Sequence, residues 1–236
     1  MRLTYLFHSC FVIENEQVTL IFDFYKDSEN AWLKRHLSSF KGIIYVFASH
    51  AHHDHFNRDI LTWKSIRQDI RYLLSSDILD ENLCVSSDMF FLSKGDVYCD
   101  ENLYVKAYGS TDQGISFYVE TGGEKLFHAG DLNDWHWKEE STQEEIAEAE
   151  AFYQNELKEI ASEVSGLDVA MYPLDPRLGA DFADGAKLFL QQIKTGLLVP
   201  MHCQGEYAFV NRFETVTQAY GCRYFSIAKE EDSIEF

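Results

Sequence analysis

The chain has 236 residues, of which 46% are hydrophobic and 15% aromatic, and its formal net charge at pH 7 is −19. This length and apolar content suffice for one sizeable core, and we expect a single domain over residues 1–236. The acidity disfavours nucleic acid as a partner. No apolar run is long enough to span a bilayer, and no signal peptide is recognisable. Five cysteines without a CxxC pair argue against a disulfide framework or a thiolate zinc site. We therefore expect a reduced, cytoplasmic protein without membrane attachment.

The first third of the chain predicts strands and few helices. Strands are expected at 2–7, 10–14 and 17–24, and their close succession favours an antiparallel meander. Apolar spacing then predicts helices at 31–40 and 56–70. Each of these helices is followed by an expected strand, at 42–48 and at 71–75. The strand at 42–48 is apolar on both faces.

The remainder predicts a second strand-rich region followed by helices. Several strands are expected between 89 and 127, with a hairpin at Gly122-Gly123. An acidic amphipathic helix over 141–164 is expected to begin at a capping box of Ser141 and Glu144 and to stop near Gly166. Its glutamates predict a solvated face. The last expected elements are a strand at 168–174, a helix at 185–194, a strand at 197–200, a helix at 207–220 and a strand at 222–228. This order suggests two similar halves, each supplying a sheet and helices.

Four of the nine histidines fall within six residues, directly after the apolar run 42–48. His50 and His52 are two apart, so in an extended segment they point to the same side and can bind one ion. Asp54 and His55 follow where the chain begins to turn, and can face a second ion. A solvated, histidine-rich loop is the alternative. The position at the end of a buried strand favours a metal site, because sites in α/β folds form there.

Two later residues can complete a two-metal site. Asp131 follows Gly130 at a strand end, and its two carboxylate oxygens can bridge two ions. His202 follows the apolar run 197–201. Alone, Asp131 is as well explained by a turn and His202 by a core position. Together with the histidine cluster they are expected to bind metal.

This pattern resembles the metallo-β-lactamase superfamily of metal-dependent hydrolases, in order and over nearly the whole chain. His8-Ser9 and the later Asp23 resemble its lactonase-like and phospholipase-like branches in particular. The resemblance implies an α/β fold, a four-layer αββα sandwich with two divalent ions in a cleft between the sheet edges. Zinc is the first expectation, with manganese or iron as alternatives. The implied ligands are His50 and His52 on the first ion, Asp54, His55 and His202 on the second, and Asp131 between them.

One position departs from the family pattern. Ser110 stands where the family has a further histidine on the first ion, and serine is a poor ligand for a divalent ion. Three accounts are open. The first site is weaker and filled out by water, or Asp112, His128 or His136 replaces the lost ligand, or only the second site is occupied.

Further residues are candidates for contact with substrate. His8 is placed near the cleft by the resemblance, and Asp112 either serves the site or caps its own turn. Trp135 and His136 form a substrate wall, supply a ligand, or anchor the acidic helix. Asp175 and Arg177 are expected to form an ion pair at the rim.

We hypothesise hydrolysis, in which a hydroxide held by the metal ions attacks an electrophilic carbon or phosphorus of a small ester, lactone or phosphodiester. Asp54 is the catalytic candidate, because it binds one ion and can orient the nucleophile. The rival hypothesis is a metal-binding sensor or scaffold without turnover, motivated by Ser110. Redox chemistry is disfavoured by the lack of a flavin-type glycine fingerprint and by the histidine at position 52.

Overall fold

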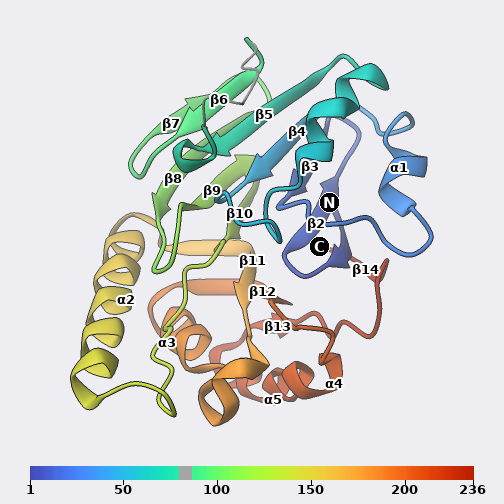
Figure 1. Ribbon diagram of the computed structural model, residues 1–236. Helices are drawn as coiled ribbons and strands as arrows, with labels where there is room; N and C mark the ends of the chain where they lie inside the picture. Colours follow the sequence, from blue (N-terminus) through green and yellow to red (C-terminus); the bar gives the residue numbers. More distant parts are fainter. Residues whose placement is uncertain (80–86) are drawn as a thin grey trace.

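The computed structural model describes residues 1–79 and 87–236, and Cys84 lies outside this part of the chain. Two seven-stranded sheets face each other, with helices on their outer sides (Figure 1). The first sheet has the order β14-β1-β2-β3-β4-β5-β6, and the second has the order β13-β12-β11-β10-β9-β8-β7. The α/β sandwich expected from the sequence is therefore confirmed.

The strands of the first sheet are β1 (Arg2–Phe7), β2 (Cys10–Glu14), β3 (Val18–Phe22), β4 (Ile43–Ala48), β5 (Ile70–Ser75), β6 (Met89–Leu92) and β14 (Ser233–Glu235). Those of the second are β7 (Val97–Cys99), β8 (Leu103–Gly109), β9 (Ile115–Thr121), β10 (Glu124–His128), β11 (Gly166–Pro173), β12 (Lys194–Met201) and β13 (Arg223–Tyr224). The α-helices are α1 (Trp32–His36), α2 (Gln143–Glu163), α3 (Asp184–Gln192), α4 (Tyr207–Val210) and α5 (Glu214–Thr217). The 3₁₀ helices are η1 (Arg58–Ser65), η2 (Ser76–Ile78), η3 (Pro176–Asp181), η4 (Asn211–Phe213) and η5 (Gln218–Tyr220). No helix among the described residues is both long and apolar enough to cross a membrane.

Strand β4 shows how the layers are built. Side chains alternate across a strand, so Tyr45 and Phe47 join the core between the two sheets, while Ile44 and Val46 pack with α1 and η1 on the outer face. Helices α2 and α3 cover the outer face of the second sheet (Figure 1). The apolar run on both faces of β4 is thus explained by burial on both sides.

Parallel pairing brings several strand ends to one edge. Strand β4 runs parallel to β3 and β5, and β11 runs parallel to β10 and β12. The residues that follow β4, β10 and β12 therefore leave their sheets at carboxyl ends, where α/β folds place their sites.

Several boundaries differ from the sequence prediction. The helix expected at 31–40 is only α1, the one at 56–70 is the 3₁₀ helix η1, and the one at 207–220 is divided among α4, η4, α5 and η5. The final strand shrinks to β13, and Gly166 begins β11 instead of ending α2. Strand β14 was not expected. It pairs antiparallel with β1, a contact between the two ends of the chain that local sequence cannot reveal.

The capping box of α2 lies one residue later than predicted. Thr142, not Ser141, is the N-cap: its side chain accepts a hydrogen bond from the Glu145 amide at 3.3 Å, and the Glu145 carboxylate accepts one from the Thr142 amide at 2.7 Å. Both threonine and serine suit this role, so the sequence alone allowed either register.

Replacing Thr142 by alanine should therefore lower the free energy of unfolding by about 1 kcal/mol, because an amide of the first turn loses its acceptor. Ser141→Ala is the matched control and should cost less than half as much. Urea denaturation followed by circular dichroism measures both. A larger loss for Ser141→Ala would contradict this cap assignment.

Candidate metal centre

The histidine cluster forms a tight turn directly after β4. The amides of His55 and Phe56 donate to the carbonyl of His52 at 3.0 and 2.8 Å, which bends the chain back on itself. In this turn Nε2 of His50 lies 3.0 Å from Nδ1 of His52. His53 turns outward, with 85% of its side chain exposed.

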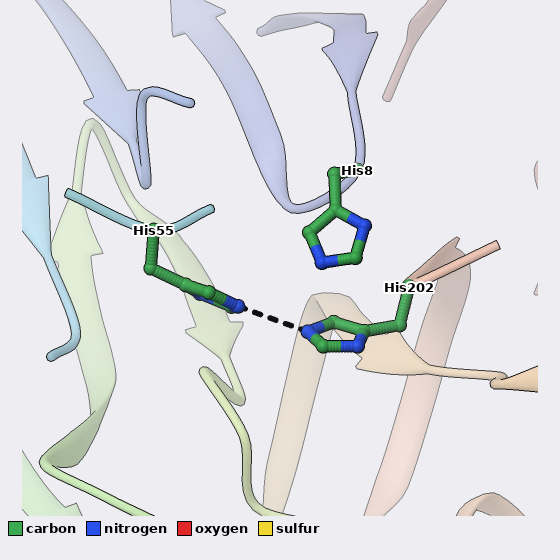
Figure 2. Close-up of side chains that lie close together, drawn as sticks. All are labelled: His8, His55 and His202. Atoms are coloured by element: carbon green, nitrogen blue, oxygen red, sulfur yellow. Dashed lines mark hydrogen bonds between the residues drawn. The ribbon is translucent and has the colours of Figure 1, made fainter. Parts of the chain in front are cut away.

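A second set of imidazoles meets from three different segments. Nε2 of His55 lies 3.0 Å from Nε2 of His202, which follows β12. The ring of His8, from the turn between β1 and β2, faces the same point, and its centroid lies 4.1 Å from that of His202 (Figure 2). Nε2 of His8 is also 3.2 Å from Oδ2 of Asp54.

Asp131 lies between the two sets. Its Oδ2 is 3.3 Å from Nε2 of His50, while its Oδ1 is 3.2 Å from Nε2 of His55 and 2.8 Å from Nε2 of His202. The residue is 5% exposed, yet Oδ1 has no hydrogen-bond partner among the described residues. Close approach without hydrogen-bond geometry is the arrangement expected of donor atoms that converge on a common point.

The donor set fits divalent metal ions. Metal–ligand bonds of about 2.0–2.2 Å place neighbouring ligand atoms roughly 3.0–3.4 Å apart. Two of the three separations around Asp131, 3.2 and 3.3 Å, fall within this range, and the third, 2.8 Å to His202, is slightly shorter. Imidazole nitrogen and carboxylate oxygen together suit zinc, iron and manganese.

Two buried carboxylates orient the imidazoles from behind. Asp23 accepts from the Ser49 amide at 2.8 Å and from its hydroxyl at 2.6 Å, and lies 2.6 Å from Nδ1 of His55. Asp175 lies 3.4 Å from Nδ1 of His202. Each contact leaves Nε2 of the histidine directed at the centre, as metal-binding histidines require.

The sequence alone does not reveal these supporting roles. Asp175 does pair with Arg177 as expected, but its contact with His202 was missed. Asp23 is indicated in the sequence only by the family resemblance. The available signal for both was a carboxylate directly after an apolar strand.

Backbone strain gathers at the centre. His8, Asp23 and His202 have φ values of 58°, 43° and 60°, in the left-handed region that residues other than glycine rarely adopt. At Gly130, with φ of 53°, a Cβ atom would lie 2.8 Å from Cβ of Ser49. The small residue before Asp131 is therefore needed for this close approach.

The carboxylates of the centre are held ionised. For Asp131, burial opposes ionisation, but the positive charges of His202 and His55 bring its pKa well below the usual range. Burial likewise opposes ionisation of Asp54, but the neighbouring His8 and His55 lower the pKa of its carboxyl group. Burial would lower the pKa of His202, but Asp131 and Asp175 raise it to about 10. Anionic groups at this depth require positive charge close by.

His8 differs from the other imidazoles. Burial and the neighbouring charge of His202 lower its pKa to about 4, so the ring is neutral at pH 7. It is 4% exposed, and its Nε2 makes no hydrogen bond of good geometry among the described residues.

The structure reduces the number of residues that could replace the metal-binding histidine for which Ser110 stands. Both ring nitrogens of His128 are in use: Nε2 lies 3.0 Å from the Ser9 carbonyl, and Nδ1 accepts from the Gly130 amide at 3.2 Å. This excludes His128 as a ligand in this arrangement. Asp112 remains, because its carboxylate, a ring nitrogen of His52 and an oxygen of Asp131 lie within 4.8 Å of one another.

The Trp135–Trp137 segment divides between two surroundings. Trp135 lies beside the centre, with its ring centroid 5.9 Å from that of His202 and its indole donating to the Asp131 carbonyl at 2.7 Å. His136 instead groups with Asp181 and Asp184. No hydrogen bond, ion pair or ring contact among the described residues joins His136 to the histidine cluster, so its role as a ligand or substrate contact stays a prediction.

The chain matches the family described as the beta-lactamase superfamily domain over residues 2–202, and it belongs to this superfamily. A search of curated proteins finds no match. The finer lactonase-like or phospholipase-like branch stays a prediction.

Solved structures similar to this chain include a metallo hydrolase from the archaeon Ignicoccus hospitalis, with 18% identity, a TM-score of 0.66, and coverage of 100% of this chain and 98% of that one. The diiron β-hydroxylase CmlA from Streptomyces venezuelae has 10% identity, a TM-score of 0.69, and coverage of 100% of this chain and 54% of that one. The isothiocyanate hydrolase from Delia radicum gut bacteria has 10% identity, a TM-score of 0.60, and coverage of 100% and 99%. At these identities the similarity shows the shared fold.

Replacing Asp23 by asparagine should lower the affinity for a divalent ion roughly 10- to 100-fold, because the orientation and basicity of His55 depend on this carboxylate. Competition with a chromophoric chelator measures the affinity. Asp100→Asn is the matched control: it removes a carboxylate that binds Arg71 and Tyr98 in a separate network, and it should leave the metal affinity unchanged. Undiminished affinity in Asp23→Asn would rule out this supporting role.

Proposed function

We propose that the protein is a metal-dependent hydrolase acting on a small ester, lactone or phosphodiester. The observation that carries this proposal is the convergence of His50, His55 and His202 on the buried, ionised carboxylate of Asp131, with His52 3.0 Å from His50. We assign His50 and His52 to a first ion, Asp54, His55 and His202 to a second, and Asp131 to both.

Bound there, two divalent ions would lower the pKa of a coordinated water towards about 7 and stabilise negative charge that develops on the substrate. The chain's own groups supply the rest. Asp54 is ionised and keeps one carboxylate oxygen near His8, so it can accept a hydrogen bond from the attacking water and fix its direction.

His8 and Trp135 are placed to face the substrate. The neutral ring of His8 beside Asp54 can donate a hydrogen bond to the substrate. Trp135, partly exposed beside His202, offers an apolar wall. It stacks on Trp137, and the Arg177 guanidinium lies 5.5 Å from the Trp137 ring. We assign substrate selection to this side of the centre.

A metal-binding protein without turnover is the second candidate. Ser110 favours it, because its hydroxyl takes part in the local turn, accepting from the Asp112 amide at 3.4 Å. Elemental analysis and turnover separate the two functions. Bound metal without hydrolysis of any substrate class supports the second candidate, and hydrolysis that depends on metal supports the first.

The direct test is a screen of small lactones, phosphodiesters and thioesters with metal-reconstituted protein. Asp54→Ala should reduce kcat/KM for any substrate found by at least about 100-fold and should weaken metal binding, because this carboxylate serves both. Glu148→Gln, on the exposed side of α2, is the control for the loss of one negative charge. Full metal content and full turnover in Asp54→Ala would refute the assignment.

A further inference from the structure

We infer that Asp112 binds the first metal ion and supplies the donor that Ser110 does not provide. This inference rests on the metal centre of the proposed function. The relevant group joins His52 and Asp112 with Asp131, whose potential ligand atoms all lie within 4.8 Å of one another. His50, in turn, approaches both His52 and Asp131.

The loop that carries Asp112 is fixed on both sides. Before it, the Thr111 hydroxyl donates to the Asn133 carbonyl at 2.5 Å and accepts from the Asn133 amide at 2.9 Å. After it, the Gln113 side chain donates to Asp77 at 2.7 Å. The position of Asp112 is therefore set by neighbours that are themselves held in place.

The same loop is pressed against the histidine cluster. The Ile115 amide donates to the Ser49 carbonyl at 2.9 Å, which ties the loop to the residue before His50. Gly114 has φ of 72°, and a Cβ atom there would lie 2.5 Å from Cβ of His50. Only glycine permits this approach, which keeps the Asp112 loop beside the first ion's imidazoles.

The carboxylate of Asp112 is free for this role. No hydrogen bond or ion pair to its oxygens occurs among residues 1–79 and 87–236. The turn is stabilised instead by the Ser110 hydroxyl, so the alternative in which Asp112 caps its own turn does not hold. The neighbouring Asp131 is only 5% exposed, and its Oδ2 faces Nε2 of His50 at 3.3 Å, so a buried carboxylate oxygen lies on the same side as the first ion's imidazoles.

The resulting donor sets have a chemical consequence. The first ion would be bound by His50, His52, Asp112 and Asp131, which provide two nitrogens and two oxygens. This set is harder than one with three imidazoles and accommodates manganese or iron more readily. His52 and Asp112 are exposed, whereas His55 and His202 are buried, so the first ion would exchange faster than the second.

The test titrates Mn²⁺ into the metal-free protein by calorimetry and records its electron paramagnetic resonance. The unsubstituted protein should bind two ions per chain and show a spin-coupled pair. Asp112→Asn should bind one ion normally and the other at least about 10-fold more weakly. At the same ratio of Mn²⁺ to protein, it should therefore show the signal of a single, uncoupled Mn²⁺ ion where the unsubstituted protein shows the coupled pair. Asp112→Glu should keep both ions, because the carboxylate remains, and Glu148→Gln should match the unsubstituted protein.

Two tightly bound ions and a coupled signal in Asp112→Asn would overturn the inference. Equal metal affinities and equal spin coupling in Asp112→Asn and Asp112→Glu would overturn it as well. Binding of fewer than two ions by the unsubstituted protein would also overturn it. The proposed function fails separately: two bound ions with Asp112-dependent coupling but no hydrolysis would contradict the hydrolase and leave the Asp112 ligand in place.

Discussion

The buried carboxylate of Asp131 is the constraint on which the centre depends. An ionised group this deep in the protein is costly unless positive charge surrounds it. Three imidazoles from two distant segments approach it within 3.3 Å, yet its Oδ1 makes no hydrogen bond among the described residues. Divalent cations would satisfy every donor at once, which is why the geometry is better explained by metal binding than by a polar network.

The fold supplies these donors because parallel strands of two sheets end at a common edge. Strand β4 delivers the histidine cluster, β10 precedes Asp131, and β12 precedes His202. The left-handed backbone at His8, Asp23 and His202 is strained, and the packed sheets on both sides hold it in place. Asp23 and Asp175 then restrict the imidazoles from behind. The rigid sheets thus fix the orientation of the metal-binding nitrogens.

Much of this arrangement could be predicted from the sequence, because its signals are local. The apolar run before His50, His52 and His55 indicates the end of a strand, and the histidines that follow it are the expected metal donors. Asp131 and His202 also follow predicted strands, which places them at the same edge. What could not be predicted depends on contacts between distant segments. The pairing of β14 with β1, the use of both nitrogens of His128, and the contact of Asp175 with His202 are such cases. The position of the α2 cap is hard to predict because Ser141 and Thr142 are both suitable N-cap residues. The predicted helices are too long because short segments can form either α or 3₁₀ helix, and helix ends are poorly determined by local sequence.

The most direct measurement is an anomalous-scattering crystal structure of the protein grown with Mn²⁺ or Zn²⁺. Two peaks are expected roughly 3.5–4 Å apart, one on each side of Asp131. The peak beside His52 should be within bonding distance of Asp112, and the other should be bound by Asp54, His55 and His202. Anomalous density absent from this region, or found only beside His136, Asp181 and Asp184, would contradict it.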